Sequence, residues 1–126
     1  MFSSVLQVAL GGAVGATLRY LTGMGVFRVL GPQEFPVAII IVNVIGSFLM
    51  GVFVVAAAQR GLHHLSPLVV TGLMGGFTTF SAFSLEAVTL YERGAFGYAA
   101  LYVGLSVGLS LAALAAGLLV ARGIWA

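Results

Sequence analysis

The stretch GLMGGFTTFSAFSLE, residues 72–86, lies in a run from residue 61 to residue 85 that carries no acidic side chain, lysine or arginine. Residues 75–84 alone contain two glycines, two threonines, two serines and three phenylalanines. Glycine weakens a helix, and hydroxyl groups bond backbone atoms that an interruption sets free. We therefore predict a helix that is broken near its middle.

The composition around this stretch indicates a membrane protein. The chain has 126 residues, of which 61% are hydrophobic and only 6% charged, against roughly 25% charged residues in a soluble domain. The few arginines are scattered singly, which excludes the clustered basic surface of a nucleic-acid binder. The absence of cysteine excludes disulfides and thiol chemistry.

Four apolar stretches are long enough to cross a bilayer as helices, which takes ~20 residues. They cover about residues 4–29, 35–58, 67–91 and 95–121. We predict an all-α fold, a single four-helix transmembrane domain over residues 1–126. Each stretch carries small residues four positions apart, a spacing that lets helices pack closely: Gly11 and Gly15, Ser47 and Gly51, Gly72 and Gly76, and Gly104 and Gly108.

The arginines at the ends of these stretches give no preferred orientation. Arg60 and Arg122 would lie on one side of the membrane, and Arg28 and Arg93 on the other. This balance gives the positive-inside rule nothing to act on. The chain would then insert both ways, unless Arg19, the histidines or neighbouring proteins decide its orientation.

A few polar side chains lie within or beside the predicted spans, where such groups are functional candidates. Asn43 either bonds another helix or offers its amide to a solute. Arg19 either extends to the interface or lines a water-filled vestibule. Glu86 balances an arginine, faces a vestibule or carries protons, whereas His63 and His64 are interpreted as interfacial, with no metal.

The broken segment itself suggests an ion site. Carbonyls exposed at a break in a membrane helix commonly coordinate a cation. Phe80, Phe83 and Ser84 share one helix face, and the positive edges of the two rings would stabilise an anion. The residues alone indicate a small, hard anion and leave open whether a structural cation accompanies it.

Three segments closely resemble the signature segments of the Fluc (CrcB) family of fluoride channels: GGAVGATLRY (11–20), VNVIGSFLMG (42–51) and GLMGGFTTFSAFSLE (72–86). The resemblance implies an antiparallel, dual-topology homodimer with two fluoride pores. It also implies a structural sodium ion at the dimer centre, held by the main-chain carbonyls of Gly75 and Thr78.

The resemblance further implies the residues of the fluoride pathway and places Arg19 at the vestibule. Ser110 is the match on the fourth span, ahead of Ser106. The family motif reads TTFSTF, and this chain has Ala82 at the third threonine, so one hydroxyl is lost while transport is expected to survive. The pathway residues are Asn43, Thr79, Phe80, Ser81, Phe83, Ser84 and Ser110.

We therefore expect a passive channel that exports fluoride across a bacterial inner membrane, and not an enzyme. One alternative is a proton-coupled exporter of the small multidrug type, which needs a membrane-embedded carboxylate. In that family the glutamate lies in the first helix, whereas here only Glu86 is placed to serve. The other alternative is a small structural subunit of a larger membrane complex.

Overall fold

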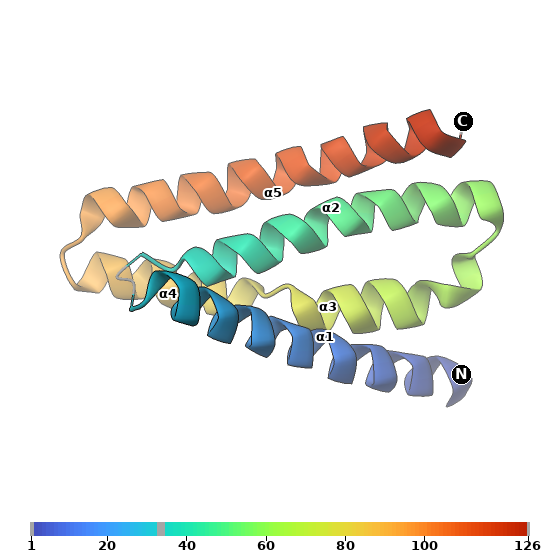
Figure 1. The fold of residues 1–126 in the computed structure, drawn as a ribbon, viewed down its shortest axis with the longest axis horizontal. Helices are drawn as coiled ribbons and strands as arrows, with labels where there is room; N and C mark the ends of the chain where they lie inside the picture. The colour runs from blue at the N-terminus through green and yellow to red at the C-terminus, as the bar shows by residue number, and fades with distance from the viewer. Residues whose placement is uncertain (1, 33–34, 126) are drawn as a thin grey trace.

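The computed structural model describes residues 2–32 and 35–125, and the regular elements within them are all helices, without a strand. Four rods lie side by side (Figure 1). Three of them are α1 (Phe2–Leu30), α2 (Val37–Arg60) and α5 (Phe96–Trp125). The remaining rod is made of shorter pieces: η1 (His63–Leu65), η2 (Pro67–Met74), α3 (Gly75–Phe77) and α4 (Phe80–Glu92).

The rods form two pairs, α2 with α5 and α1 with η2 and α3 (Figure 1). Both chain termini lie at one end of the molecule, together with the connection between α2 and η1. The other two connections lie at the opposite end. This arrangement agrees with the alternating sides on which the end-of-span arginines were expected.

Glycines with positive φ mark all three connections. Gly61 has φ 67° directly after α2, and its N–H bonds the carbonyl of Ala57. Gly31 and Gly94 have φ 74° and 78° at the ends of α1 and α4. A side chain at these positions would be strained, so glycine is what lets each helix end there.

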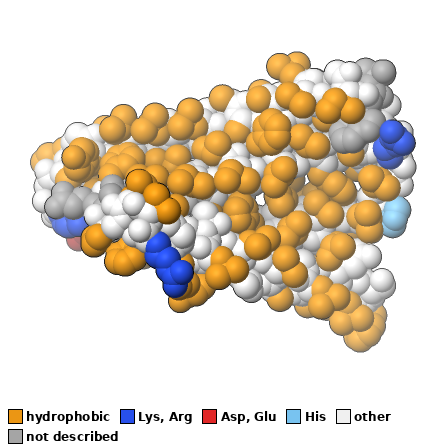
Figure 2. Space-filling view, in the orientation of Figure 1, with side chains coloured by type: hydrophobic (Ala, Val, Ile, Leu, Met, Phe, Trp, Pro, Cys, Tyr) orange, Lys and Arg blue, Asp and Glu red, His pale blue; other side chains and the backbone are white. Residues whose placement is uncertain are grey.

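Three helical segments are long and apolar enough to cross a membrane: Val37–Arg60, His63–Glu92 and Phe96–Ile124. α1 is long enough, with 29 residues, but is not among them, because its glycine, serine, threonine, glutamine and arginine residues lower its mean hydropathy. Much of the molecular surface is hydrophobic (Figure 2), with charged side chains few and separate on that face. The chain is therefore a multi-pass membrane protein, with α1 as the least apolar rod.

Small residues bring the rods together within each pair. A methyl group built on Gly72 would lie 2.9 Å from the Cα of Gly11, and one on Gly76 would lie 2.7 Å from the carbonyl of Gly12. In the other pair, a methyl group on Gly51 would lie 3.0 Å from the N of Leu118. These glycines allow contact between helix backbones.

The fourth predicted seam behaves differently. A methyl group on Gly104 or Gly108 would meet nothing within 4 Å. Among the residues that the structure describes, this face of α5 has no helix packed on its glycines. The expectation that every helix packs tightly on another holds for α5, which packs on α2 through Gly117 and not through Gly104 and Gly108.

The break in the third rod is confirmed, but its position differs from the expectation. Gly75 is helical, with φ −61° and ψ −37°, and α3 continues through Gly76 to Phe77. The extended residues are Thr78 and Thr79. Gly76 supports close packing against α1 instead of interrupting the helix, because its missing side chain leaves space for the backbone of Gly12.

Candidate functional site

The broken segment is stabilised by its own two threonines. Thr78 has ψ 161° and Thr79 has φ −153° and ψ 121°, so the chain is extended over both residues. The backbone N–H and the hydroxyl of Thr78 both donate to the carbonyl of Met74, at 2.9 and 2.7 Å. The hydroxyl oxygen of Thr79 accepts the N–H of Ala82 at 3.0 Å and caps α4. These threonines end one helix and begin the next.

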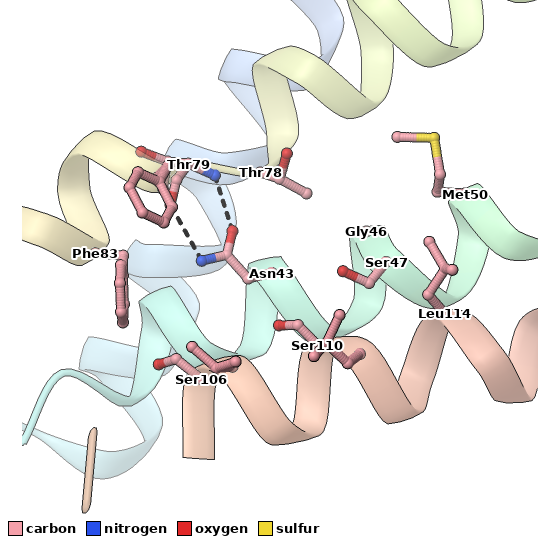
Figure 3. Close-up of a pocket in the computed structure, with 13 residues that line it drawn as sticks. Asn43, Gly46, Ser47, Met50, Thr78, Thr79, Phe83, Ser106, Ser110 and Leu114 are labelled. Carbon is pink, nitrogen blue, oxygen red and sulfur yellow. Dashed lines mark hydrogen bonds between the residues drawn. The ribbon is translucent and has the colours of Figure 1, made fainter. Parts of the chain in front are cut away.

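Asn43, on α2, bonds both backbone groups of Thr79. Its Oδ1 accepts the Thr79 N–H at 2.8 Å, and its Nδ2 donates to the Thr79 carbonyl at 3.1 Å (Figure 3). The interpretation of Asn43 as a link between helices is therefore confirmed. An amide nitrogen has two N–H groups, so this bond uses only one of them.

Arg19 reaches the other side of the break. Its Nε donates to the carbonyl of Gly76 at 3.1 Å. The same side chain lines a hollow of about 500 Å³ along α1, together with Tyr20, Met24 and Phe27 among others. Arg19 thus borders an open space, as the vestibule prediction requires, while it also bonds the helix end before the break.

A cavity of about 310 Å³ lies where the break faces α2 and α5 (Figure 3). Five of the seven residues predicted for the ion pathway line it: Asn43, Thr79, Phe80, Phe83 and Ser110. The other lining residues are Gly46, Ser47, Met50, Thr78, Ser106, Val107, Leu111 and Leu114. Side chains far apart in the sequence therefore meet in one place.

The other two predicted residues, Ser81 and Ser84, are not among the residues that line this cavity. The hydroxyl of Ser84 donates to the carbonyl of Phe80 at 2.9 Å, one helical turn back. Ser81 is exposed, and its Oγ lies 3.4 Å from the Thr79 hydroxyl. Ser81, one residue after Phe80 on α4, lies on a different helix face from Phe80 and Phe83. Ser84 is four residues after Phe80 and shares that face, as expected, but its hydroxyl bonds back to its own helix.

Aromatic rings form one wall of the cavity. The Phe80 and Phe83 ring centroids are 5.3 Å apart, and Phe83 and Tyr102 are 5.4 Å apart. Tyr102 also meets Phe35 in an edge-to-face contact at 5.7 Å. Phe80 is 77% exposed within the single chain, so most of its ring is available to a further molecule.

Sequence reasoning underestimated Ser106 and missed Tyr102. Ser106 is 4% exposed and Tyr102 is fully buried. Their hydroxyls meet each other, one turn apart on α5, yet neither makes a hydrogen bond of good geometry in the part of the chain that the structure describes. A buried hydroxyl without a partner requires an explanation such as a water or an ion. The available signal was the segment LYVGLSVGLS (101–110), which sets a tyrosine and two serines four residues apart on one helix face.

Several carbonyls at the break also lack partners. Met74, Gly76 and Thr79 each accept a bond from the protein. Within residues 2–32 and 35–125, no donor bonds the carbonyls of Gly75 or Thr78. Both residues are at least partly exposed in the single chain. Two backbone oxygens at a membrane-depth break are therefore available to a cation.

The remaining candidate residues lie elsewhere. His63 and His64 are exposed at the end of the bundle, and the described residues contain no group of three histidine, cysteine or acidic side chains that would hold a metal ion. Glu86 is half-buried on α4 and is not among the residues that line the cavity at the break.

Comparison with known proteins adds an independent line of evidence. The model of the family described as "CrcB-like protein, Camphor Resistance (CrcB)" matches residues 6–118. A relative from Ruegeria sp. (strain TM1040), named "Fluoride-specific ion channel FluC", is 68% identical over 124 residues, which cover 98% of each chain. Proteins of the same name from Roseobacter denitrificans (65% identity; 97% of this chain, 98% of the relative) and Rhizobium etli (49%; 93% and 94%) also match.

Proposed function

This chain belongs to the CrcB family, and from that membership we propose that it is a passive ion channel selective for fluoride. Such a protein catalyses no reaction and is not an enzyme. Relatives that are 65–68% identical over nearly the whole chain carry the name of a fluoride-specific channel. The question for the structure is which of its groups would take the ion.

The observation that carries the proposal is the unpartnered hydroxyl of Ser106 in the wall of the cavity. Fluoride is a small anion that must exchange its hydration shell for hydrogen-bond donors. Ser106, Ser110 and the second amide N–H of Asn43 would supply donors, and Phe83 would present its positive ring edge. A mostly apolar lining with a few donors suits an ion that has to bind and leave again.

The proposed working unit is an antiparallel homodimer. Three features of the single chain support it: the exposure of Phe80, the open glycine face on α5 and the balanced arginines. A second copy would cover the Phe80 ring, and small residues at Gly104 and Gly108 would allow a helix to approach closely. Symmetry would then produce two equivalent pathways.

A structural sodium ion at the centre of this dimer fits the donor set. Sodium is a hard cation, and hard cations prefer oxygen ligands. Among the described residues no donor bonds the carbonyls of Gly75 and Thr78, and two copies of the chain would bring four such oxygens together. The ion would hold the two breaks against each other and supply no chemistry of its own.

The proposed setting is a bacterial inner membrane, across which the channel would export fluoride from the cytoplasm. Hydrogen fluoride is uncharged, so it enters cells from acidic surroundings and dissociates inside. A pathway selective for the anion would let the accumulated fluoride leave down its electrochemical gradient. The bacterial sources of the named relatives support this setting.

The test is efflux from liposomes loaded with potassium fluoride, started with valinomycin and followed with a fluoride electrode. We expect rapid fluoride efflux, and no efflux from matched liposomes loaded with potassium chloride. The variant Phe80→Ile should slow fluoride efflux, because it removes an aromatic ring from the cavity wall. The variant Glu86→Gln should retain fluoride efflux. If the protein were a proton-coupled exporter, the same variant would lose transport. Equal efflux of both anions, or none of either, would contradict the proposal.

A further inference from the structure

The helix that ends at the break has carbonyls without helical partners, as every helix end does. The structure separates them into two groups. Met74 and Gly76 are bonded by side chains or backbone from Thr78 and Arg19, whereas the carbonyl of Gly75, which lies between them in sequence, is not. The bond from Arg19 is the one that comes from a different rod, and it spans 57 residues in sequence.

We infer that Arg19 is a positioning residue for the break, acting through its Nε–H on the carbonyl of Gly76. Together with Asn43 it forms a brace, defined as the Arg19–Gly76 and Asn43–Thr79 hydrogen bonds, which fixes the backbone on both sides of Thr78. The brace keeps the carbonyls of Gly75 and Thr78 directed away from protein donors. Its consequence for transport rests on the proposed function.

The local packing supports this role for Arg19. Gly12, Gly15 and Ala16 lie one to two turns before Arg19 on α1, and the methyl group that Gly76 lacks would lie 3.0 Å from the N of Ala16. The two backbones are therefore close enough for a short stretch of side chain to cross between them. The Nε atom, only four bonds from Cα, makes the contact, while the rest of the guanidinium stays beside the hollow along α1.

This geometry separates the effect of the donor from the effect of the charge. Glutamine carries an N–H donor four bonds from Cα, as arginine does at Nε, but no charge. Lysine keeps the charge and has a methylene group at that place. Methionine has similar length and neither property. If the brace acts through the donor, glutamine should replace Arg19 better than lysine does.

The experiment compares Arg19→Gln, Arg19→Lys and Arg19→Met with the unaltered dimer in lipid nanodiscs, using amide hydrogen–deuterium exchange in peptides covering residues 75–80. We expect exchange at Thr78–Phe80 to rise about tenfold in the lysine and methionine variants, since a hydrogen bond to a charged donor has been lost, and to change less than about twofold in the glutamine variant. Thr22→Ala is the matched control, because its hydroxyl bonds only the carbonyl of Leu18 on its own helix.

The inference would be overturned if the lysine variant exchanged as slowly as the unaltered protein and the glutamine variant exchanged fast. That result would show that Arg19 acts through its charge. So would equal exchange in all variants. If the methionine variant fails to assemble, the glutamine and lysine pair still decides. Fluoride efflux is measured on the same samples: a protein that carries no fluoride would refute the proposed function while the exchange ranking still tests the brace.

Discussion

At the scale of single residues, Asn43 shows why one side chain can serve structure and transport together. Its amide bonds both backbone groups of Thr79, and it also lines the cavity. A side-chain amide carries an acceptor oxygen and a donor nitrogen on one carbon, so it can bond the N–H and the carbonyl of one residue at the same time. A residue that supplies only one of them would leave a backbone group at membrane depth without a partner.

The variants Asn43→Asp and Asn43→Leu test this double requirement. Aspartate keeps the bond to the Thr79 N–H and places an oxygen against the Thr79 carbonyl, while leucine loses both bonds. Each unpaired backbone group should cost about 1–3 kcal/mol, so the melting temperature of the dimer in detergent should fall for aspartate and further for leucine. Fluoride efflux should fall at least about tenfold in both. A leucine variant with unaltered melting and efflux would refute the role of this residue.

For Ser106 we predict the opposite combination, an effect on transport without a loss of stability. Its hydroxyl oxygen is buried without a hydrogen bond of good geometry in the described part of the chain and meets the hydroxyl of Tyr102, so Ser106→Ala removes at most that weak contact. We expect the melting temperature to stay the same or to rise, while fluoride efflux falls about tenfold through the loss of one donor. Thr17→Ala serves as the control, since its hydroxyl bonds only Ala13 on α1. Equal efflux in both variants would remove Ser106 from the pathway.

At the scale of elements, the close contact between α1 and the third rod depends on glycines that face each other. A methyl group at Gly76 would lie against the backbone of Gly12 and Ala16, which cannot move aside as a flexible side chain would. We expect Gly76→Ala to lower the free energy of unfolding by about 1–3 kcal/mol. Gly23→Ala, in open space on α1, should have no such cost and should stabilise the helix by up to ~1 kcal/mol. Unfolding titrations in mixed micelles would show both effects, and equal values for the two variants would contradict the packing argument.

The same elements show which parts of the fold could be predicted from the sequence. Hydropathy and turn residues predicted the helical rods, and the hydroxyls of residues 78–84 predicted a break. The break lies at Thr78 and Thr79 and not at the double glycine, because a glycine between close helices serves packing as readily as interruption. The π-helical turn over Pro67–Met74 and the bond from Arg19 to Gly76 depend on which rods become neighbours, and residue patterns along one rod do not contain that information.

At the scale of the whole molecule, much of the described surface is hydrophobic, as a membrane protein requires. Phe80 is largely exposed beside the cavity, and nothing in the described part of the chain packs on Gly104 and Gly108 of α5. Figure 1 places the termini and the connection after α2 at one end, and the remaining connections at the other. Arg60 and Arg122 therefore lie opposite Arg28 and Arg93 along the bundle. If antiparallel pairs form because copies insert in opposite orientations, then changing the balance of these four arginines should change activity, although none of them lines the cavity at the break.

Two variants of opposite bias test that dependence. Removing Arg28 and Arg93 leaves Arg60 and Arg122 at the end with the termini, with Arg19 within α1, so the positive-inside rule predicts that the end with the termini stays cytoplasmic. Removing Arg60 and Arg122 should give the reverse orientation. Each protein is fused at its C-terminus to a reporter that is active in the cytoplasm and, separately, to a reporter that is active outside it. Each reporter should be active in only one of the two variants. In the unaltered chain, both reporters should be active.

Each biased variant expressed alone should fail to protect cells from fluoride, because all its copies face one way and cannot form antiparallel pairs. Expression of both variants together should restore protection, since each supplies the orientation that the other lacks. Purified dimers from the mixed cells should contain one copy of each variant, which intact mass measurement would detect. Protection by one variant alone, with its orientation confirmed as single, would show that parallel copies or single chains conduct and that the antiparallel dimer is not the working unit.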